Sequence, residues 1–264
     1  MKIPFQQVDT FADRPFSGNP AAVMPLEAWL DDATLQAIAA ENNLAETAFI
    51  VPWAGEEADF ELRWFTPAVE VALCGHATLA TGHVLLSRNP AMPKVRFMTR
   101  KAGPLEVARD GEAYRLALPA WHMEAKPLPD HVAAIGGTPV ETLWREGGYA
   151  LLRYASAEEV LALAPDFRAM RPMGDILFIA TAPGTSTDIV SRVFAPGAGI
   201  EEDPVTGSAH CLLATYWAKA LGRERFTAYQ ASERGGYLDV ELAGDRVYLG
   251  GKCVTVIEGA FTLG

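Results

Sequence analysis

One pattern occurs twice in this chain: a strand-like segment with Phe-x-Pro, a polar loop, and a long apolar run that opens with glycine. The first copy holds Arg63–Pro67 and Gly75, and the second holds Arg192–Pro196 and Gly207. Proline and glycine are 8 positions apart in the first copy and 11 in the second, so the second loop is longer by three residues. A repeat on this scale indicates two similar domains. The alternative is a coincidence between two proline-containing turns that each precede a helix.

The apolar run of the second copy predicts a helix that begins between Thr206 and Ser208 and continues to Leu221, because no helix breaker occurs before Gly222. Its apolar side chains lie nearly all round the helix, which is typical of a buried one. The start of such a helix offers unpaired N–H groups that attract anions, and small residues there let a ligand approach the backbone.

Strand-like segments outnumber helices in both halves of the chain. A helix is expected from Asp31 or Asp32 to about Ala40, with an aspartate as its cap. Residues 119–129 hold three prolines and little periodicity, which favours a link between domains. One central apolar helix among many strands argues against an evenly alternating, doubly wound sheet. The pattern predicts an α+β chain in which a strongly curved sheet wraps around a buried helix, twice.

The bulk properties argue against several classes of partner. The 264 residues include 22 Lys and Arg against 33 Asp and Glu, and the net charge of −11 argues against nucleic acid or an anionic membrane surface. There is no run of 18 apolar residues and no signal-peptide pattern at the N-terminus, so no membrane span is expected. The three cysteines have no metal-site spacing, which favours reduced thiols in the cytoplasm.

Glu46 is the first candidate for chemistry. It lies among Leu44, Ala45, Ala48 and Phe49. A carboxylate in apolar surroundings has a raised pKa and can take up and release a proton near neutral pH. The alternative is a solvent-facing glutamate on a half-buried strand, which the residues alone favour.

The two helix starts supply further candidates. His76 follows Gly75, and the positive end of a helix disfavours a charged imidazole, so His76 is expected to be neutral toward a ligand or else structural. Ser208 holds the matching place in the second copy, either as an N-cap or as a ligand for a carboxylate. Asp203 lies among adjacent acids, so it is either a bound or protonated group or part of a solvated loop. Cys74 is a conceivable nucleophile or thiol base.

Several common motifs are missing. The glycines near residue 199 do not form a dinucleotide fingerprint, because Glu202 stands where the third glycine should be. There is no phosphate-binding Gly-rich loop and no Gly-x-Ser-x-Gly elbow. Nothing here therefore indicates NAD, ATP or acyl-serine chemistry. Metal binding by the acids around Asp203 is the weaker option, because no His lies at ligand spacing beside them, and we expect no metal.

The chain resembles the PhzF-like phenazine-biosynthesis family, within the wider diaminopimelate-epimerase-like superfamily. The motifs that carry this resemblance follow the family's order over nearly the whole chain: Val8–Phe11, Phe16–Val23, Asn43–Phe49, Arg63–Pro67, Leu73–Thr78, Glu202–Ala209, and Gln230–Ser232 before Arg234–Gly236.

The resemblance implies two similar lobes, each a barrel-like antiparallel sheet around a central helix, with the active site in the cleft between them. We place the first lobe at residues 1–118, joined by the C-terminal segment 257–264, and the second at residues 119–256. A homodimer is also expected by resemblance only.

The resemblance also implies roles for individual residues. Glu46 becomes the general acid/base of a cofactor-independent proton transfer. His76 and Asp203 match positions that assist the reaction or hold the substrate, and Ser208 matches a substrate-binding position. The backbone N–H groups of Gly75 and Gly207 are available for a carboxylate, and Asn19 matches a residue that lines the cleft.

The expected activity is that of an isomerase acting on a small carboxylate-bearing metabolite, similar to trans-2,3-dihydro-3-hydroxyanthranilate isomerase. One alternative is an amino- or hydroxy-acid racemase or epimerase that uses Cys74. The superfamily's epimerases use one cysteine from each lobe, and the second copy here has no cysteine at the matching place, which favours Glu46. The other alternative is a small-molecule-binding protein without catalysis.

Overall fold

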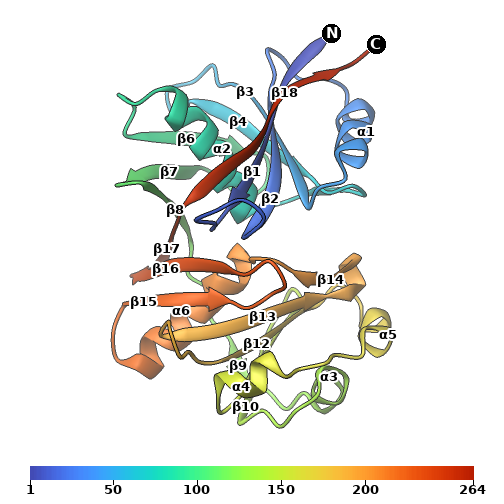
Figure 1. The fold of residues 1–264 in the computed structure, drawn as a ribbon, viewed down its shortest axis with the longest axis vertical. Helices are drawn as coiled ribbons and strands as arrows, with labels where there is room; N and C mark the ends of the chain where they lie inside the picture. The colour runs from blue at the N-terminus through green and yellow to red at the C-terminus, as the bar shows by residue number, and fades with distance from the viewer. The chain divides into compact units, whose positions relative to one another are not determined.

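The computed structural model describes residues 1–264, and the chain divides into two compact units (Figure 1). Unit 1 comprises Met1–Leu118 and Tyr248–Gly264, and unit 2 comprises Pro119–Val247. The returning segment was expected at residue 257; the segment that groups with unit 1 begins at Tyr248. Its strand β18 (Cys253–Thr262) pairs antiparallel with β1 (Lys2–Thr10) over the full length of β1, which places the C-terminal segment with unit 1.

Both units combine many strands with few helices, so the fold class is α+β, as expected. Besides β1 and β18, unit 1 contains β2 (Asn19–Pro25), α1 (Asp32–Asn42), β3 (Glu46–Pro52), β4 (Phe60–Phe65), β5 (Glu70–Val71), α2 (Gly75–Arg88), β6 (Lys94–Thr99), β7 (Leu105–Asp110) and β8 (Ala113–Pro119). Unit 2 contains β9 (Glu124–Ala125), α3 (Pro129–Ile135), β10 (Glu141–Arg145), β11 (Tyr149–Arg153), α4 (Ala157–Leu161), α5 (Phe167–Met170), β12 (Leu177–Pro183), β13 (Ile189–Ala195), β14 (Ile200–Asp203), α6 (Gly207–Leu221), β15 (Arg225–Gln230) and β16 (Gly236–Ala243). Strand β17 (Arg246–Gly251) leads back toward unit 1. No helix combines the length and hydropathy that a membrane-crossing segment needs.

The expected first helix is confirmed. Asp31 is the N-cap of α1, and its carboxylate accepts a hydrogen bond from the Thr34 N–H. Asn43 ends the helix in the left-handed conformation. The buried residues Leu35, Ile38 and Ala39 form its inner face.

The sheets of both units are mixed, where an antiparallel arrangement was expected. In unit 1, β2 runs parallel to β3, and β4 runs parallel to β6. In unit 2, β11 runs parallel to β12, and β13 runs parallel to β15. Parallel neighbours need a crossover between them, and the helices supply it: α1 and α2 in unit 1, and α4 with α5, and α6, in unit 2. The matching order of pairings bears out the prediction of two similar lobes.

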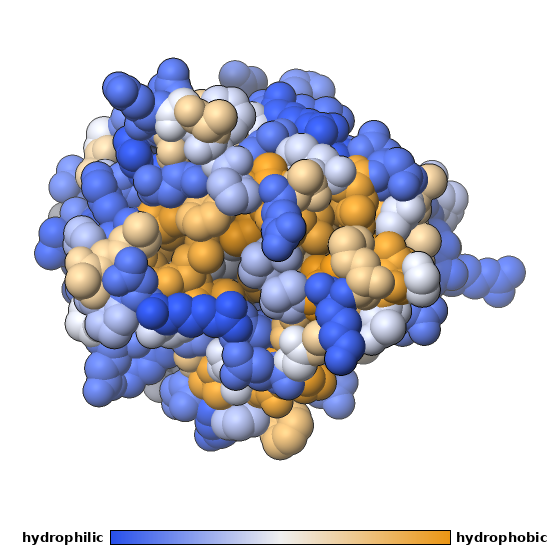
Figure 2. Space-filling view, turned by 90° about the horizontal axis from the view of Figure 1, so that it is seen from above, coloured by the Kyte–Doolittle hydropathy of each residue, from blue (hydrophilic) through white to orange (hydrophobic).

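Helix α2 is the central helix of unit 1. It contacts β1, β2, β3, β6, β7 and β18, so the curved sheet wraps around it. Gly82 allows the closest approach, because a Cβ atom at this position would lie 2.4 Å from Cγ1 of Val107 on β7. A second cluster packs α1 on the other side of β3, through Leu35, Ile38 and Phe49. Figure 2 shows hydrophobic side chains between hydrophilic ones on one face of the molecule.

We expect Gly82→Ala to lower the free energy of unfolding by about 1–3 kcal/mol, because the added methyl group would overlap the stiff Val107 side chain. Urea denaturation measures this change. Gly259→Ala is the control, since no atom lies within 4 Å of a Cβ there, and it should change stability by less than about 0.5 kcal/mol. A Gly82→Ala protein as stable as wild type would contradict the close packing of α2 on β7.

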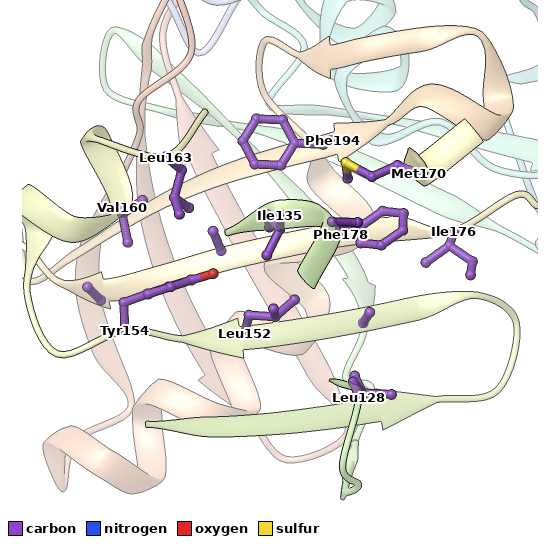
Figure 3. Close-up of a cluster of buried hydrophobic side chains, with 14 of the residues drawn as sticks. Leu128, Ile135, Leu152, Tyr154, Val160, Leu163, Met170, Ile176, Phe178 and Phe194 are labelled. Carbon is purple, nitrogen blue, oxygen red and sulfur yellow. The ribbon is translucent and has the colours of Figure 1, made fainter. Parts of the chain in front are cut away.

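The core of unit 2 lies between its sheet and its short helices. Figure 3 shows Leu152, Phe178 and Phe194, from β11, β12 and β13, within this cluster. Side chains of α3, α4 and α5 also belong to it, among them Ile135, Val160 and Met170. On α6, the indole N–H of Trp217 donates to Oγ1 of Thr181, so the long helix is bound to β12 by a buried hydrogen bond.

The repeat predicted from Phe-x-Pro extends to an ion pair in each unit. Arg63 on β4 donates from Nε and Nη2 to the two oxygens of Glu70, each at 2.8 Å. Arg192 on β13 donates to Glu202 in the same two-pronged way, at 2.8 and 2.9 Å. Each glutamate lies five positions before the first glycine of the following helix. The three extra residues of the second loop are therefore accommodated between Arg192 and Glu202.

This pairing makes the stability depend on pH in a defined direction. The hydrogen bonds from Arg63 hold the pKa of Glu70 below its ordinary value. The folded state therefore gains stability from ionised Glu70 above the ordinary pKa, and loses it as the pH falls through the lower folded-state value. We expect the difference in unfolding free energy between wild type and Glu70→Gln to shrink from pH 7 to about pH 3. A constant difference would contradict this linkage.

Candidate active site

Three polar side chains meet at one end of unit 1. Asn19 is the first residue of β2, Glu46 is the first residue of β3, and His76 is the second residue of α2. Because β2 and β3 are parallel, with Ala21 opposite Glu46, both strands begin at the same end of the sheet. Helix α2 also begins here. The structure thus brings together residues that are 27 and 30 positions apart in the sequence.

The imidazole of His76 lies at the centre of this group. Its Nε2 is 3.1 Å from Oε2 of Glu46, although the approach is not aligned as a hydrogen bond. Its Nδ1 is 3.3 Å from the amide nitrogen of Asn19 and 3.5 Å from Sγ of Cys74. Asn19 and His76 are buried, and the Glu46 side chain is 14% exposed. Glu46 therefore lies in a mostly enclosed setting rather than on an open strand surface.

The contact with Asn19 determines the tautomer of the neutral His76 imidazole. An amide NH₂ group only donates hydrogen bonds, so Nδ1 accepts and the ring proton is on Nε2, facing Glu46. When the ring is charged, Nδ1 also carries a proton, and Sγ of Cys74 is the neighbouring acceptor. In both forms an N–H group of His76 faces the Glu46 carboxylate.

The expectation of a neutral His76 is wrong, because the pKa of His76 is shifted upward rather than downward. Burial lowers the pKa of His76, but the electrostatic and hydrogen-bonding influence of Cys74 and Glu46 outweighs it, so the pKa lies well above its ordinary value. We attribute this to Glu46, because Cys74 is not ionised at neutral pH. The sequence shows that His76 is at a helix start. It does not show that Glu46, 30 residues earlier, lies beside the imidazole, because this depends on the pairing of β2 and β3.

Cys74 is a poor base in this setting. It is the N-cap residue of α2, where a lowered thiol pKa was conceivable. Burial instead raises its pKa, and the Glu46 carboxylate adds to the rise. Burial also raises the pKa of Cys211 to about 12, so this second buried thiol is protonated as well.

Glu46, Cys74 and His76 are the residues that could hold a metal ion, since their ligand atoms lie within 4.8 Å of one another. The arrangement does not suit a single ion. Glu46 faces Nε2 of the imidazole, whereas Cys74 faces Nδ1, and one ion binds only one of these nitrogens. The three side chains therefore do not form a site for one metal ion.

Unit 2 has the corresponding helix start at α6. Thr206 is its N-cap, so the prediction of Ser208 as the N-cap is wrong; the helix begins at Gly207, and Ser208 is its second residue, as His76 is in α2. Asp203 ends β14, and its carboxylate accepts a hydrogen bond from the Thr206 hydroxyl. The structure thus brings Asp203, Gly207 and Ser208 together at the start of α6.

Gln230 is a residue of this second group for which the sequence reasoning proposed no role. Its Oε1 accepts from the Thr206 N–H at 2.9 Å, and its Nε2 donates to the Asp203 carbonyl at 2.7 Å. The side chain is fully buried. A signal was present: Phe226, Ala228 and Gln230 alternate on the inner face of β15, and a glutamine in such a series needs buried partners.

The comparison with known proteins places these residues in a family. A family model of phenazine biosynthesis-like proteins, PhzC–PhzF, matches residues 8–259. The chain belongs to the PhzC–PhzF family. An uncharacterized isomerase of Pseudomonas aeruginosa is 46% identical to this PhzF-family chain over 264 residues, and the match covers all of both proteins. An uncharacterized isomerase of Halalkalibacterium halodurans is 40% identical over 272 residues, again with both proteins covered in full.

Solved structures agree with this assignment. The crystal structure of a PhzF-family phenazine biosynthesis protein from Enterococcus faecalis matches with a TM-score of 0.91 and 42% sequence identity, and the match covers all of both chains. The match to the PhzF-family fold therefore includes both copies of the repeat described above. Together with the isomerase relatives, the match makes this PhzF-family chain an enzyme of the isomerase class.

Proposed function

We propose that this isomerase moves a proton on a small carboxylate-bearing metabolite, with Glu46 as the general acid/base and without a cofactor. Glu46 takes a proton from a carbon next to a double bond, the electron pair shifts and the double bond moves. The carboxylic acid formed then returns a proton to another carbon of the same molecule. No electron is gained or lost overall, so the step needs neither an oxidant nor a reductant.

The observation that carries this proposal is the position of the Glu46 carboxylate. It is mostly enclosed, and His76 faces it at 3.1 Å from a rigid helix start. A base must be held in one geometry to act on carbon, because a misplaced proton acceptor loses much of its effect. His76 is then a positioning residue for the carboxylate, and Asn19 positions the His76 ring.

Further residues are proposed for substrate binding. The N–H groups at the start of α2, including that of Gly75, suit a substrate carboxylate. Asp203, Gly207 and Ser208 are proposed to contribute polar contacts to the substrate from the start of α6. The proposed substrate class is that of trans-2,3-dihydro-3-hydroxyanthranilate, a small unsaturated carboxylate whose isomerase the family motifs of this chain resemble.

Proton exchange in deuterated water tests the proposed function. The protein is incubated with a panel of small unsaturated and amino carboxylic acids that includes trans-2,3-dihydro-3-hydroxyanthranilate, and deuterium in the products is followed by mass spectrometry and NMR. We expect incorporation or rearrangement with at least one unsaturated carboxylate. A protein that exchanges no compound in the panel would contradict the proposal.

The second candidate function is an amino- or hydroxy-acid racemase with Cys74 as a base. The closeness of Cys74 to His76, at 3.5 Å, is the observation that favours it. The raised pKa of the thiol argues against it. Cys74→Ser distinguishes the two, because the racemase loses its activity with this change, whereas the proposed isomerase keeps it.

A further inference from the structure

Three residues other than glycine have a positive φ angle: Phe11 at 55°, Phe16 at 69° and Asn43 at 49°. This left-handed conformation costs free energy in an L-residue, because Cβ approaches the carbonyl oxygen. For a bulky side chain it is a true outlier that needs an explanation.

Two of the three have a structural explanation. Asn43 ends helix α1, and asparagine tolerates the left-handed conformation that a helix end requires. Phe11 is 1% exposed, and its ring packs so closely on Gly251 that a Cβ there would lie 2.5 Å from it. The core contacts of Phe11 offset its strain.

Phe16 has no such explanation. Its residue surface is 83% exposed, so its ring gains almost nothing from packing. The backbone is nevertheless held in place. The Phe16 N–H donates to Oδ2 of the buried Asp9 at 2.9 Å. Gly18, two residues on, also has a positive φ, and a Cβ at this position would lie 2.0 Å from the Thr10 carbonyl oxygen. The loop thus keeps a strained phenylalanine pointing outward.

The loop lies beside the candidate base. It joins β1 to β2 and ends at Asn19, whose amide contacts His76. Phe16 is three positions before Asn19, so their Cα atoms are at most about 11 Å apart. The backbone that carries the exposed ring is therefore at the end of unit 1 that holds Glu46 and His76.

We propose that Phe16 is a substrate-contacting residue that determines specificity, by packing its ring on the apolar, unsaturated part of the substrate. This inference rests on the proposed function. The ring buries its surface only when the substrate is bound, which explains why the strain persists without packing in the free protein. An aromatic ring at this end of unit 1 favours carboxylates with a flat carbon skeleton over those that are charged along their whole length.

Two variants test this role. Phe16→Gly removes the ring together with the strain, and Phe16→Leu keeps an apolar side chain without the flat ring. We expect the urea midpoint of Phe16→Gly to equal or exceed that of wild type. Its KM for an exchanging substrate should rise about tenfold or more, with a smaller change in kcat. The KM of Phe16→Leu should lie between those of the wild type and Phe16→Gly.

A binding measurement separates this inference from the proposed function. Anthranilate, a flat amino carboxylate, serves as a probe for calorimetry with Glu46→Gln and with Glu46→Gln/Phe16→Gly. We expect at least tenfold weaker binding to the second protein, whether or not the wild type shows exchange.

Three results would overturn the assignment. A lowered urea midpoint of Phe16→Gly with unchanged KM would make Phe16 structural. Unchanged KM with a change of molecular mass in sedimentation would make Phe16 part of a contact between copies of this chain. Equal anthranilate affinities, or no binding to either protein, would also exclude contact between the ring and a flat carboxylate.

Discussion

Replacing Glu46 by glutamine should abolish most of the deuterium exchange, with a fall in rate of about 10²–10⁴-fold. Glutamine has nearly the shape of glutamate and can still contact Nε2 of His76, but it has no carboxylate to receive a proton from carbon. The measurement is the initial rate of deuterium incorporation under saturating substrate, so that the comparison reports kcat rather than binding.

The matched control is Glu41→Gln. Glu41 is exposed near the end of α1, so its loss of charge should leave the exchange rate unchanged. Urea midpoints of both variants show whether they are folded. Exchange by folded Glu46→Gln within a few-fold of wild type would exclude Glu46 as the base. It would shift attention to Cys74 and Asp203.

The second large effect concerns stability. We expect Arg63→Ala to lower the free energy of unfolding by about 3–5 kcal/mol, because Arg63 is 1% exposed and its loss leaves Glu70 without its two-pronged partner. The cationic group also lies 5.0 Å from the centre of the Phe65 ring, so aromatic contact is lost as well. Urea or thermal denaturation measures the change.

Arg88→Ala is the control for this prediction. Arg88 and Glu258 form an ion pair of 2.9 Å, but their side chains are 48% and 66% exposed, and such surface pairs contribute less than about 1 kcal/mol. A double variant, Arg63→Met with Glu70→Leu, should recover part of the lost stability, since apolar groups can replace an ion pair whose cationic partner is buried. Similar losses in Arg63→Ala and Arg88→Ala would mean that burial of Arg63 does not govern its contribution.

The repeat, the strand-rich α+β pattern and helix α1 could all be predicted from local patterns. Phe-x-Pro and the glycine at each helix start are visible in the sequence, and Asp31 and Asn43 have the chemistry of helix ends. The parallel pairs were missed because direction depends on crossovers, and alternation of apolar residues is the same in both kinds of pairing. The first residues of strand β2, Asn19 and Pro20, are typical of a turn, so the local pattern does not show that a strand begins there.

The candidate site was only partly predictable for the same reason. Glu46 and His76 were candidates from the residues themselves and Asn19 from the resemblance, but the sequence contains nothing that fixes the 3.1 Å and 3.3 Å contacts of the imidazole. The pKa direction of His76 depends on these contacts, so reasoning from the helix start alone produced the wrong sign. Phe16 was part of a motif that carried the resemblance, yet the role proposed for it depends on its φ angle and its exposure together.

The pairing of β1 with β18 constrains how this chain can fold during its synthesis. Lys2 lies opposite Thr262, and Thr10 lies opposite Cys253. The first strand therefore cannot pair with β18 until about 250 further residues have been synthesised. Until then one edge of β1 is open, and an unpaired edge is a site of aggregation. Unit 2 contains no segment from beyond residue 247 and can form earlier. During synthesis, unit 2 can therefore fold before unit 1 is complete, and unit 1, which contains Glu46, folds last.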